Sequence, residues 1–462
     1  MPSPLKVIIV GGGLSGACLA NGLVNKADGL IDVTIFERDT EASSRDGYQI
    51  RLGAHALVGF RACLTERQYA DCLRCFGRSG GVVSSAPAIF NTNLDLVLDL
   101  SKFPAYQKSA PVGRARLRNF LQEPLRASNV MRYGMKFTGF DVVEGETPEE
   151  SRVRAYFDDG SSQDCDILIS AEGSSSRANR QVGLNNIIED VPKAGEGGFS
   201  ESALYTHLLP TPGSLPRLIS PDELRPSTAA RRGSTSNAEA KPSNYDEDQA
   251  SLFVAMAWED GPSAAEASLL KDKKPVMRDM LQASGFHPDY LKLVDALDPQ
   301  EIMAVPWRHS KADTPVDWRE KLLLAAGKES QQDPRIAHPR VWFVGDSIHA
   351  MLPYRGMGAN QALHDTADAL GPLLELARRK KADGSVADDE VCRQVAIYES
   401  AMIPRAFNWV KQSAAQGLPD LDSFKGKIIL VFVRAALHLV GGVMSVLRMC
   451  GWEPKDDAPE LP

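Results

Sequence analysis

Length, composition and charge limit the kind of protein that this chain can be. Its 462 residues suffice for two or three domains, and its 43% hydrophobic and 24% charged residues are typical of a soluble globular protein. These values exclude a largely disordered chain, a collagen-like repeat and a polytopic membrane protein. The 60 acidic and 52 basic residues give a net charge of −8, which argues against a nucleic-acid-binding protein.

The first forty residues predict a nucleotide-binding βαβ unit. A β-branched run over residues 5–10 predicts a buried parallel strand, followed by a helix over 14–24 and a second strand over 32–37. The apolar run is too short for the core of a signal peptide, and it leads into glycines rather than a cleavage site. We therefore expect a cytoplasmic protein.

A glycine pattern, Gly11-x-Gly13-x-x-Gly16, lies between the first strand and the helix. Such glycines allow a tight turn, a close approach of the backbone to a diphosphate, and close packing of the helix on the strand. The diphosphate would lie at the helix N-terminus, where unpaired N–H groups favour negative charge. Glu37 ends the second strand, 21 residues after Gly16, where an acid can accept hydrogen bonds from ribose hydroxyls. The pattern predicts an ADP-containing cofactor and leaves NAD and FAD open.

The second half of the chain favours a flavin. Strands are predicted over 166–170 and 341–344, and a long helix from about 357 to 379. Asp346 follows the second of these strands, where a carboxylate can hold a polyol chain such as ribityl. The glycine-rich helix start at 356–360 offers N–H donors to a pyrimidine carbonyl or to a developing anion.

The middle of the chain predicts an antiparallel sheet. Alternating segments over 203–208 and 251–258 predict strands with one polar face. Between them, residues 210–244 are rich in Pro, Ser, Ala and Arg and predict a surface loop insertion, disordered in part. Parallel units at both ends of the chain with a sheet between them imply two interwoven domains.

The seven cysteines predict neither a disulfide scaffold nor a metal site. They are sparse for the length of the chain, and their number is odd. Cys72 and Cys75 form a lone CxxC, without a second pair or histidines at ligand spacing. We interpret this pair as incidental thiols on a helix.

The segment over residues 428–447 is long and apolar enough to suggest a membrane-spanning helix. However, Arg434 and His438 lie inside it, four residues apart and so on one face of a helix. A charge near the middle of a span costs about 2.5–3.5 kcal/mol. We predict a buried or docked C-terminal helix, with a helix in the membrane interface and a true span as alternatives.

Three motifs together resemble the class A flavin-dependent aromatic hydroxylases, the family typified by p-hydroxybenzoate hydroxylase. The first is VIIVGGGLSGACLA with VTIFERD, the second is DILISAEGSSSR from Asp166, and the third is GDSIHAMLPYRGMGANQALHDTADAL from Gly345. Glu172 stands where the family usually has Asp, and Ser347-Ile348 replaces the usual small pair before His349. The resemblance runs from residue 7 to about residue 370 and suggests a member from microbial secondary metabolism.

The resemblance implies an α/β fold with a Rossmann-type FAD-binding domain, interwoven with a mixed or antiparallel-sheet substrate domain, plus C-terminal helices. We expect the FAD-binding domain at 1–75, 108–185 and 335–385. The substrate domain is expected at 76–107 and 186–334, with the loop insertion near 210–245. Residues 386–462 are expected to form a C-terminal helical extension.

The resemblance also implies which residues bind FAD. Arg114 resembles an arginine that contacts the cofactor, and Arg51, preferred over Arg45, resembles one in a mobile loop near the flavin. Asp346 would bind ribityl, and the helix start at 356–360 would face the pyrimidine edge. The predicted set is Gly11, Gly13, Ser15, Gly16, Glu37, Arg38, Arg51, Arg114, Asp346, Pro353, Gly356, Gly358, Ala359 and Asn360.

The implied activity is that of an FAD-dependent monooxygenase. It would use NADPH or NADH as a transient co-substrate and O₂ to insert one oxygen atom, by hydroxylation or epoxidation, into an aromatic or polycyclic small molecule. Tyr205, His207 and Arg308 are the candidates for catalysis on the middle sheet, where a base could ionise a phenol.

Two other activities and several properties stay open from sequence. One alternative is a flavin-dependent halogenase, although the W-x-W-x-I-P stretch typical of those enzymes is not found. The other is an FAD protein with a non-redox role, as a scaffold or in a pericyclic reaction. We expect a monomer or homodimer without nucleic acid, either cytoplasmic or associated with a membrane through peripheral contact of residues 428–450.

Overall fold

A computed structural model of the chain describes most of the residues on which these predictions depend. The described residues are 3–41, 49–76, 88–90, 92–99, 110–144, 150–188, 202–208, 252–258, 264–297, 299, 302–326, 333–414 and single positions between 428 and 450. The chain divides into two compact units, which alternate along the sequence. The first comprises Met1–Ala86, Ser101–Gly198 and Trp307–Pro462, and the second comprises Pro87–Leu100 and Phe199–Pro306.

A five-stranded parallel sheet forms the centre of the first unit. Its order is β17 (Val341–Phe343), β11 (Ile167–Ser170), β1 (Leu5–Val10), β2 (Ile31–Glu37) and β7 (Met131–Tyr133). The apolar residues of β1 and β11 are buried, as expected for strands covered on both faces. The predicted strand over 5–10 is β1, and the predicted helix over 14–24 is α1 (Leu14–Lys26), which continues two residues further.

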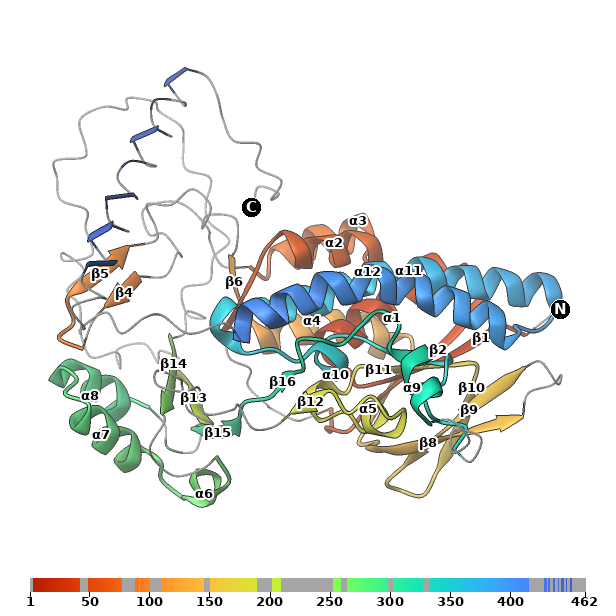
Figure 1. The fold of residues 1–462 in the computed structure, drawn as a ribbon, viewed down its shortest axis with the longest axis horizontal. Helices are drawn as coiled ribbons and strands as arrows, with labels where there is room; N and C mark the ends of the chain where they lie inside the picture. Colours follow the sequence, from red (N-terminus) through yellow and green to blue (C-terminus); the bar gives the residue numbers. More distant parts are fainter. Residues whose placement is uncertain are drawn as a thin grey trace. The chain divides into compact units, whose positions relative to one another are not determined.

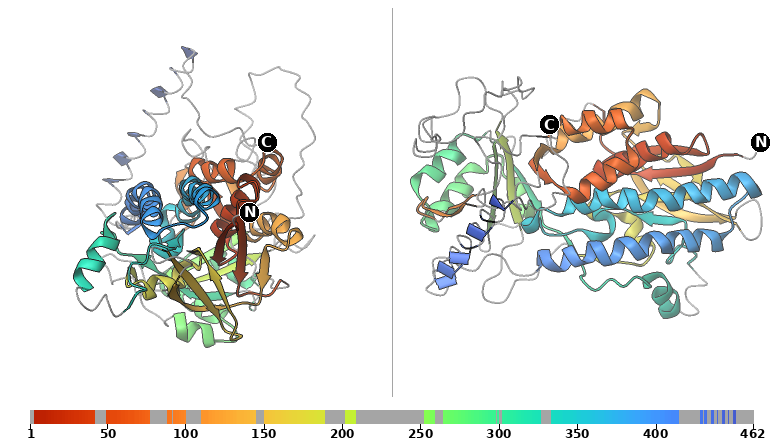
Figure 2. Two further views of the ribbon diagram at one scale, coloured as in Figure 1. Left: turned by 90° about the vertical axis from the view of Figure 1, so that its right-hand side faces the viewer. Right: turned by 90° about the horizontal axis from the view of Figure 1, so that it is seen from above.

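Long helices pack beside this sheet in the first unit. α11 (Gly358–Asp383) contacts α1, α2 (Ala54–Cys63) and α12 (Asp388–Ala414), and α4 (Arg114–Ala127) contacts α1. Figures 1 and 2 show α11 and α12 running side by side along one face of the unit. Because α12 packs on α11, the contacts place residues 388–414 in the first unit together with residues 307–326. The predicted domain limits assign those two ranges to a separate extension and to the substrate domain.

Smaller elements complete the first unit. An antiparallel sheet has the order β10 (Ser162–Cys165), β9 (Ser151–Phe157), β8 (Phe137–Glu144). Two strand pairs are β3 (Gln49–Leu52) with β6 (Ala110–Gly113) and β12 (Ile187–Ile188) with β16 (His309–Ser310). The remaining helices are α3 (Glu66–Leu73), α5 (Arg177–Gln181), α9 (Trp318–Ala326), α10 (Asp346–His349), η3 (Gly173–Ser175) and η7 (Pro353–Arg355).

The second unit contains the predicted antiparallel sheet. β13 (Ser202–Leu208) pairs with β14 (Leu252–Trp258) on one side and β15 (Met303–Pro306) on the other, all antiparallel. The other elements of this unit are β4 (Ala88–Phe90), β5 (Leu96–Asp99), α6 (Ala264–Leu269), α7 (Lys274–Ala283) and α8 (Pro288–Asp295). The predicted loop insertion near 210–245 lies outside the described residues. The parallel and antiparallel sheets confirm the predicted fold class.

The C-terminal apolar segment is described only at single positions. At the described positions between 428 and 450, large apolar side chains are exposed, among them Val431, Phe432, Leu439 and Met449. These positions lie on one face of the segment, and the buried or docked helix stays a prediction. Among the described residues, no helix combines the length and apolar character needed to cross a membrane.

Candidate functional site

A cavity of about 420 Å³ in the first unit lies at the carboxyl edge of the parallel sheet. Ligands of open α/β sheets bind at this edge, where the strands end and the loops begin. The cavity brings together five of the predicted cofactor-binding residues. It is lined by Val10, Gly11, Gly13, Phe36, Glu37, Arg38, Asp39, Arg114, Arg118, Met135, Lys136, Phe137, Ala171, Glu172, Gly173, Ser175, Arg177, Arg180 and Arg308.

The three motif glycines have different surroundings. Gly11 has a φ of +106°, and a Cβ there would overlap the carbonyl oxygen of Ala171. A Cβ on Gly16 would overlap the carbonyl oxygen of Gly11. In contrast, a Cβ on Gly13 would meet nothing within 4 Å, and Gly13 faces the cavity as the N-cap of α1, without a side-chain cap. Gly11 and Gly16 therefore serve the fold, whereas Gly13 leaves open the space that a diphosphate needs.

The peptide of Gly12 is fixed from both sides by buried or half-buried side chains. Glu37 Oε2 accepts a hydrogen bond from Gly12 N at 2.8 Å, and Gln122 Nε2 on α4 donates to Gly12 O at 2.6 Å. Tyr133 Oη in turn donates to Gln122 Oε1 at 3.0 Å. The sequence analysis missed Gln122. The one available signal was its helical spacing of eight residues from Arg114, which places both on one face of α4.

Arg114 and Arg118 lie one turn apart on α4, and both line the cavity. Arg118 Nε is buried and has no hydrogen-bond partner among the described residues. Leaving a buried donor unsatisfied costs about 1–3 kcal/mol, and more when the group is charged. The guanidinium is therefore suited to an anionic ligand in the cavity. Arg118 was not among the predicted site residues, although its spacing of four from Arg114 was visible in the sequence.

Asp346 connects the cavity with the third motif. Solvent reaches this residue from one side. The protein atoms around its carboxyl nevertheless remove part of its hydration and raise its pKa, while His349 and Arg114 oppose that shift. Arg114 therefore acts on both the cavity and Asp346. Gly345, with a φ of +63°, precedes this carboxylate, and a Cβ on it would lie 3.3 Å from Ser15 Oγ at the start of α1. The first and third motifs thus meet at this point.

Asn360, in the first turn of α11, forms hydrogen bonds with two further predicted residues. Its Oδ1 accepts from Gly53 N at 2.8 Å, and its Nδ2 donates to Arg51 O at 2.9 Å and to Gly356 O at 3.0 Å. A Cβ on Gly358 would lie 3.8 Å from Asp346 Oδ1. Pro353 begins η7, and Ala359 is the second residue of α11. Arg45 lies outside the described residues.

Glu172, the departure in the second motif, is committed to its own loop. Its Oε2 accepts from Ser170 Oγ at 2.9 Å and Ser176 Oγ at 2.8 Å, and from Ala178 N at 3.1 Å. Its Oε1 accepts from Arg177 N at 3.1 Å. The carboxylate therefore caps the N-terminus of α5, where negative charge is favourable. Next to it, η3 supplies Ser175 to the cavity, and α5 supplies Arg177 and Arg180.

The three candidates for catalysis do not share one sheet. Tyr205 and His207 lie on β13, whose side chains are outside the described residues. Arg308 follows β15, which ends at Pro306, and its guanidinium bonds to Ser175 Oγ at the edge of the cavity. The placement of Arg308 on the middle sheet is wrong, because the hydroxyl of the second motif holds this side chain in the first unit.

Comparison with known proteins agrees with this geometry. Residues 9–70 match the NAD(P)-binding Rossmann-like domain. The chain is 22% identical over 431 residues to the FAD-dependent monooxygenase sor5 of Hypocrea jecorina, covering 89% of this chain and 84% of the relative. It is 24% identical over 451 residues to the dual O-methyltransferase/FAD-dependent monooxygenase elcB of Phaeosphaeria nodorum, of which it spans only 45%.

The fold also matches solved structures. Klebsiella pneumoniae HpxO complexed with FAD and uric acid has a TM-score of 0.57 and 17% identity, covering 89% of this chain and 87% of that one. The parallel sheet, the glycine turn and the groups around Asp346 supply the features that an FAD-binding fold of this type requires. The chain is thus similar in sequence and in fold to FAD-dependent monooxygenases.

Proposed function

We propose that the chain is a monooxygenase that uses FAD, NADPH or NADH, and O₂ to insert one oxygen atom into an aromatic or polycyclic small molecule. One observation carries this proposal. Groups from three distant parts of the sequence, around Gly13, Arg114 and Asp346, converge at the carboxyl edge of the sheet. The three groups suit a diphosphate, its counter-charge and a polyol chain in turn.

The roles of the cavity residues follow from their chemistry. Gly13 and the N-terminus of α1 would hold the diphosphate, with Arg114 and Arg118 as cationic partners. Glu37 would accept hydrogen bonds from the ribose, and Arg38 would lie beside the adenosine. These residues would bind the ADP half of FAD in the cavity of about 420 Å³.

The third motif would hold the reactive half of the cofactor. Asp346 would bind the ribityl chain, and the N-terminus of α11 would face the ring. Bound FAD supplies the electron transfer and oxygen activation that side chains cannot perform. The start of α11 has no side-chain cap, so its N–H groups and dipole can stabilise negative charge on a neighbouring ring. Asn360 would keep Arg51 beside this helix start.

The substrate class rests on the family and on the second unit. The fold resembles HpxO, whose structure contains uric acid, a planar heteroaromatic ring. The antiparallel sheet around β13 is proposed as the substrate surface, with Tyr205 and His207 as candidates to ionise a phenol. Arg308 is proposed to assist the cofactor side, since it lines the cavity with Glu37.

The proposal is tested with purified full-length protein. We expect a bound yellow flavin, oxidation of NADPH or NADH that a phenolic or polycyclic substrate accelerates, and a product heavier by one oxygen atom. The Asp346→Ala variant should lose both flavin and activity, whereas Asp383→Ala, at the far end of α11, should keep both. Protein that binds no flavin would refute the proposal.

The same assay separates the alternatives. A halogenase would require halide and give a halogenated product. A scaffold or pericyclic enzyme would convert its substrate without oxidising NADPH or NADH. Either result, with FAD bound, would retain the proposed cofactor site and replace the proposed reaction.

We also propose that the segment 428–450 makes peripheral contact with membranes, where lipophilic substrates partition. Exposed apolar side chains at Phe432, Leu439 and Met449 support this contact. Co-sedimentation with phosphatidylcholine vesicles tests it, and protein that stays in solution would contradict it. We expect the remainder of the chain to be a cytoplasmic monomer or homodimer.

A further inference from the structure

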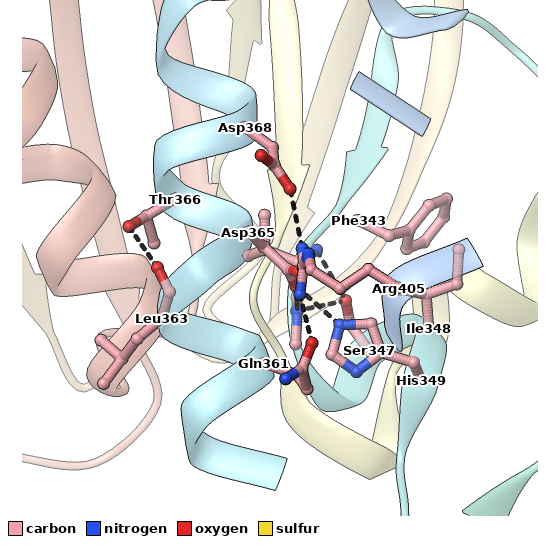
Figure 3. Close-up of polar contacts among 12 residues, drawn as sticks. Phe343, Ser347, Ile348, His349, Gln361, Leu363, Asp365, Thr366, Asp368 and Arg405 are labelled. Atoms are coloured by element: carbon pink, nitrogen blue, oxygen red, sulfur yellow. Dashed lines mark hydrogen bonds and ion pairs between the residues drawn. The ribbon is translucent and has the colours of Figure 1, made fainter. Parts of the chain in front are cut away.

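A buried row of three charged side chains connects the third motif with α12. It joins Arg405 on α12, Asp365 on α11 and His349 on α10, and Figure 3 shows the three side chains pointing toward one another. His349 Nε2 lies 2.6 Å from Asp365 Oδ2, and both side chains are 0% exposed. Arg405 Nη2 donates to Asp365 Oδ1 at 2.8 Å. These three side chains therefore link α12 with the predicted ribityl site.

Asp365 also fixes the backbone at that site. Gly345 N donates to Asp365 Oδ2 at 2.7 Å, and Gly345 directly precedes Asp346. One carboxylate thus holds both the turn before Asp346 and the imidazole three residues after it. Any change in the charge of Asp365 or His349 would reach Asp346 through these two contacts.

The charges around His349 come from four helices. Asp346 lies on its own helix, Asp365 and Asp368 on α11, Arg405 and Tyr398 on α12, and Arg114 on α4 faces Asp346. Burial lowers the pKa of the His349 imidazole, but Asp365 and Asp346 raise it by more, so the net shift is upward, while Arg405 opposes it. The pKa of Asp365 falls to about 2, because His349 and Arg405 outweigh its burial.

One atom of these three side chains is unsatisfied. His349 Nδ1 is buried and has no hydrogen-bond partner among the described residues. A buried ring nitrogen without a hydrogen-bond partner costs about 1–3 kcal/mol. If His349 only stabilised the fold, this unsatisfied nitrogen would be a cost without a benefit. If His349 carries a positive charge that stabilises an anionic ligand, the cost is offset.

We infer that Asp365, fixed in place by Arg405, holds His349 as an imidazolium next to Asp346, and that this buried positive charge positions the flavin and favours its reduced, anionic form. His349 is a positioning residue in this scheme, acting through Asp346 and through space. The charge of His349 is weakly screened, because the side chains of His349 and Asp365 are 0% exposed. The inference rests on the proposed function, since it concerns the same FAD site.

The pH dependence of FAD affinity tests this inference. In the wild-type protein, affinity should fall as pH rises through the pKa of His349, because the imidazolium is lost. Asp365→Asn removes the anion that raises this pKa, so the midpoint should move to lower pH. Arg405→Gln removes the cation that opposes it, so the midpoint should move to higher pH. Opposite shifts from the two partners are not expected of a structural brace.

Two further variants complete the test. His349→Gln should remove the pH dependence, weaken FAD binding at neutral pH about tenfold, the factor that 1.4 kcal/mol gives, and make the flavin midpoint potential more negative. Asp368→Asn is the matched control, because Asp368 accepts from the same Arg405 Nη2 at 2.7 Å but forms no ion pair with His349. It should leave the midpoint pH and the potential unchanged.

The outcomes separate the inference from the proposed function. Unchanged midpoint pH and potential in His349→Gln, with a lower melting temperature, would overturn the inference and leave the FAD site in place. If Asp365→Asn does not fold, Arg405→Gln still tests the sign of the shift, since this side chain is 16% exposed. Wild-type protein without FAD would refute the proposed function itself.

Discussion

Two glycines at the cavity are expected to have different roles, Gly11 in the stability of the fold and Gly13 in FAD binding. Because a Cβ on Gly13 would meet nothing within 4 Å and would enter the cavity, Gly13→Ala should fold normally and bind FAD at least about tenfold more weakly. Gly11→Ala should not fold stably, since its φ of +106° and the carbonyl of Ala171 leave no room. Melting temperature and flavin fluorescence titration measure the two effects. Equal destabilisation by both variants would contradict this distinction.

Arg118 lines the cavity and carries a buried donor without a hydrogen-bond partner among the described residues. Since no described residue bonds to this Nε, Arg118→Ala should cost little stability but weaken FAD binding by about 1.5–3 kcal/mol, the range for hydrogen bonds to charged groups. Arg116→Ala is a suitable control, because Arg116 is exposed on the same helix and does not line the cavity. Isothermal titration of FAD into the apoprotein gives both values. Similar losses in the two variants would contradict a specific role for Arg118.

At the scale of elements, a buried histidine links β9 to the segment before β17. His338 Nε2 lies 3.2 Å from Ser151 Oγ, and Arg340 N donates to its Nδ1 at 3.3 Å. Burial is the main cause that lowers the pKa of His338 to about 4, with Arg340 and Arg319 adding to it against Asp388. In the unfolded chain the imidazole titrates near its ordinary value of 6.5. The unfolded state therefore binds the proton first.

This linkage predicts that the contribution of His338 to stability is present above about pH 6.5 and declines as pH falls toward 4. The melting temperature of the wild-type protein should fall over that range. His338→Gln, which stays neutral, should show a shallower decline. Thermal melts at closely spaced pH values, compared with wild type, measure the slope, and identical slopes would contradict the assignment.

For the whole molecule, the sequence predicted the parts that depend on local pattern. The glycine spacing, Glu37 and the apolar run of β1 indicate a βαβ unit because their periods and distances are short. Contacts that close over long separations could not be predicted this way. Gln122 reaches Gly12 across 110 residues, and Arg405 reaches Asp365 only because α12 packs on α11. Arg308 was misplaced for the same reason, since a hydroxyl 133 residues away holds it.

The contacts of α12 with the rest of the first unit lead to a prediction about truncated chains. Tyr398 on α12 stacks on Trp342 with ring centroids 5.6 Å apart and donates to Phe343 O at 2.6 Å. Glu399 forms a largely buried ion pair with Arg319 at 2.8 Å. Breaking a buried pair costs about 3–5 kcal/mol, and each large apolar side chain of this helix adds about 1.5–3 kcal/mol. These contacts attach α12 to the strand that precedes Asp346.

Two truncations should therefore behave differently. A chain ending at residue 414 keeps all of α12, so it should retain FAD and its melting temperature while losing any vesicle binding. A chain ending at residue 386 lacks Tyr398, Glu399 and Arg405, so it should fail to fold or bind no FAD. The flavin-to-protein ratio after gel filtration measures both. The shorter chain lacks the contacts of α12 with β17 and the ion pair of Arg405 with Asp365. Full FAD retention by this chain would therefore show that α12 does not support the site.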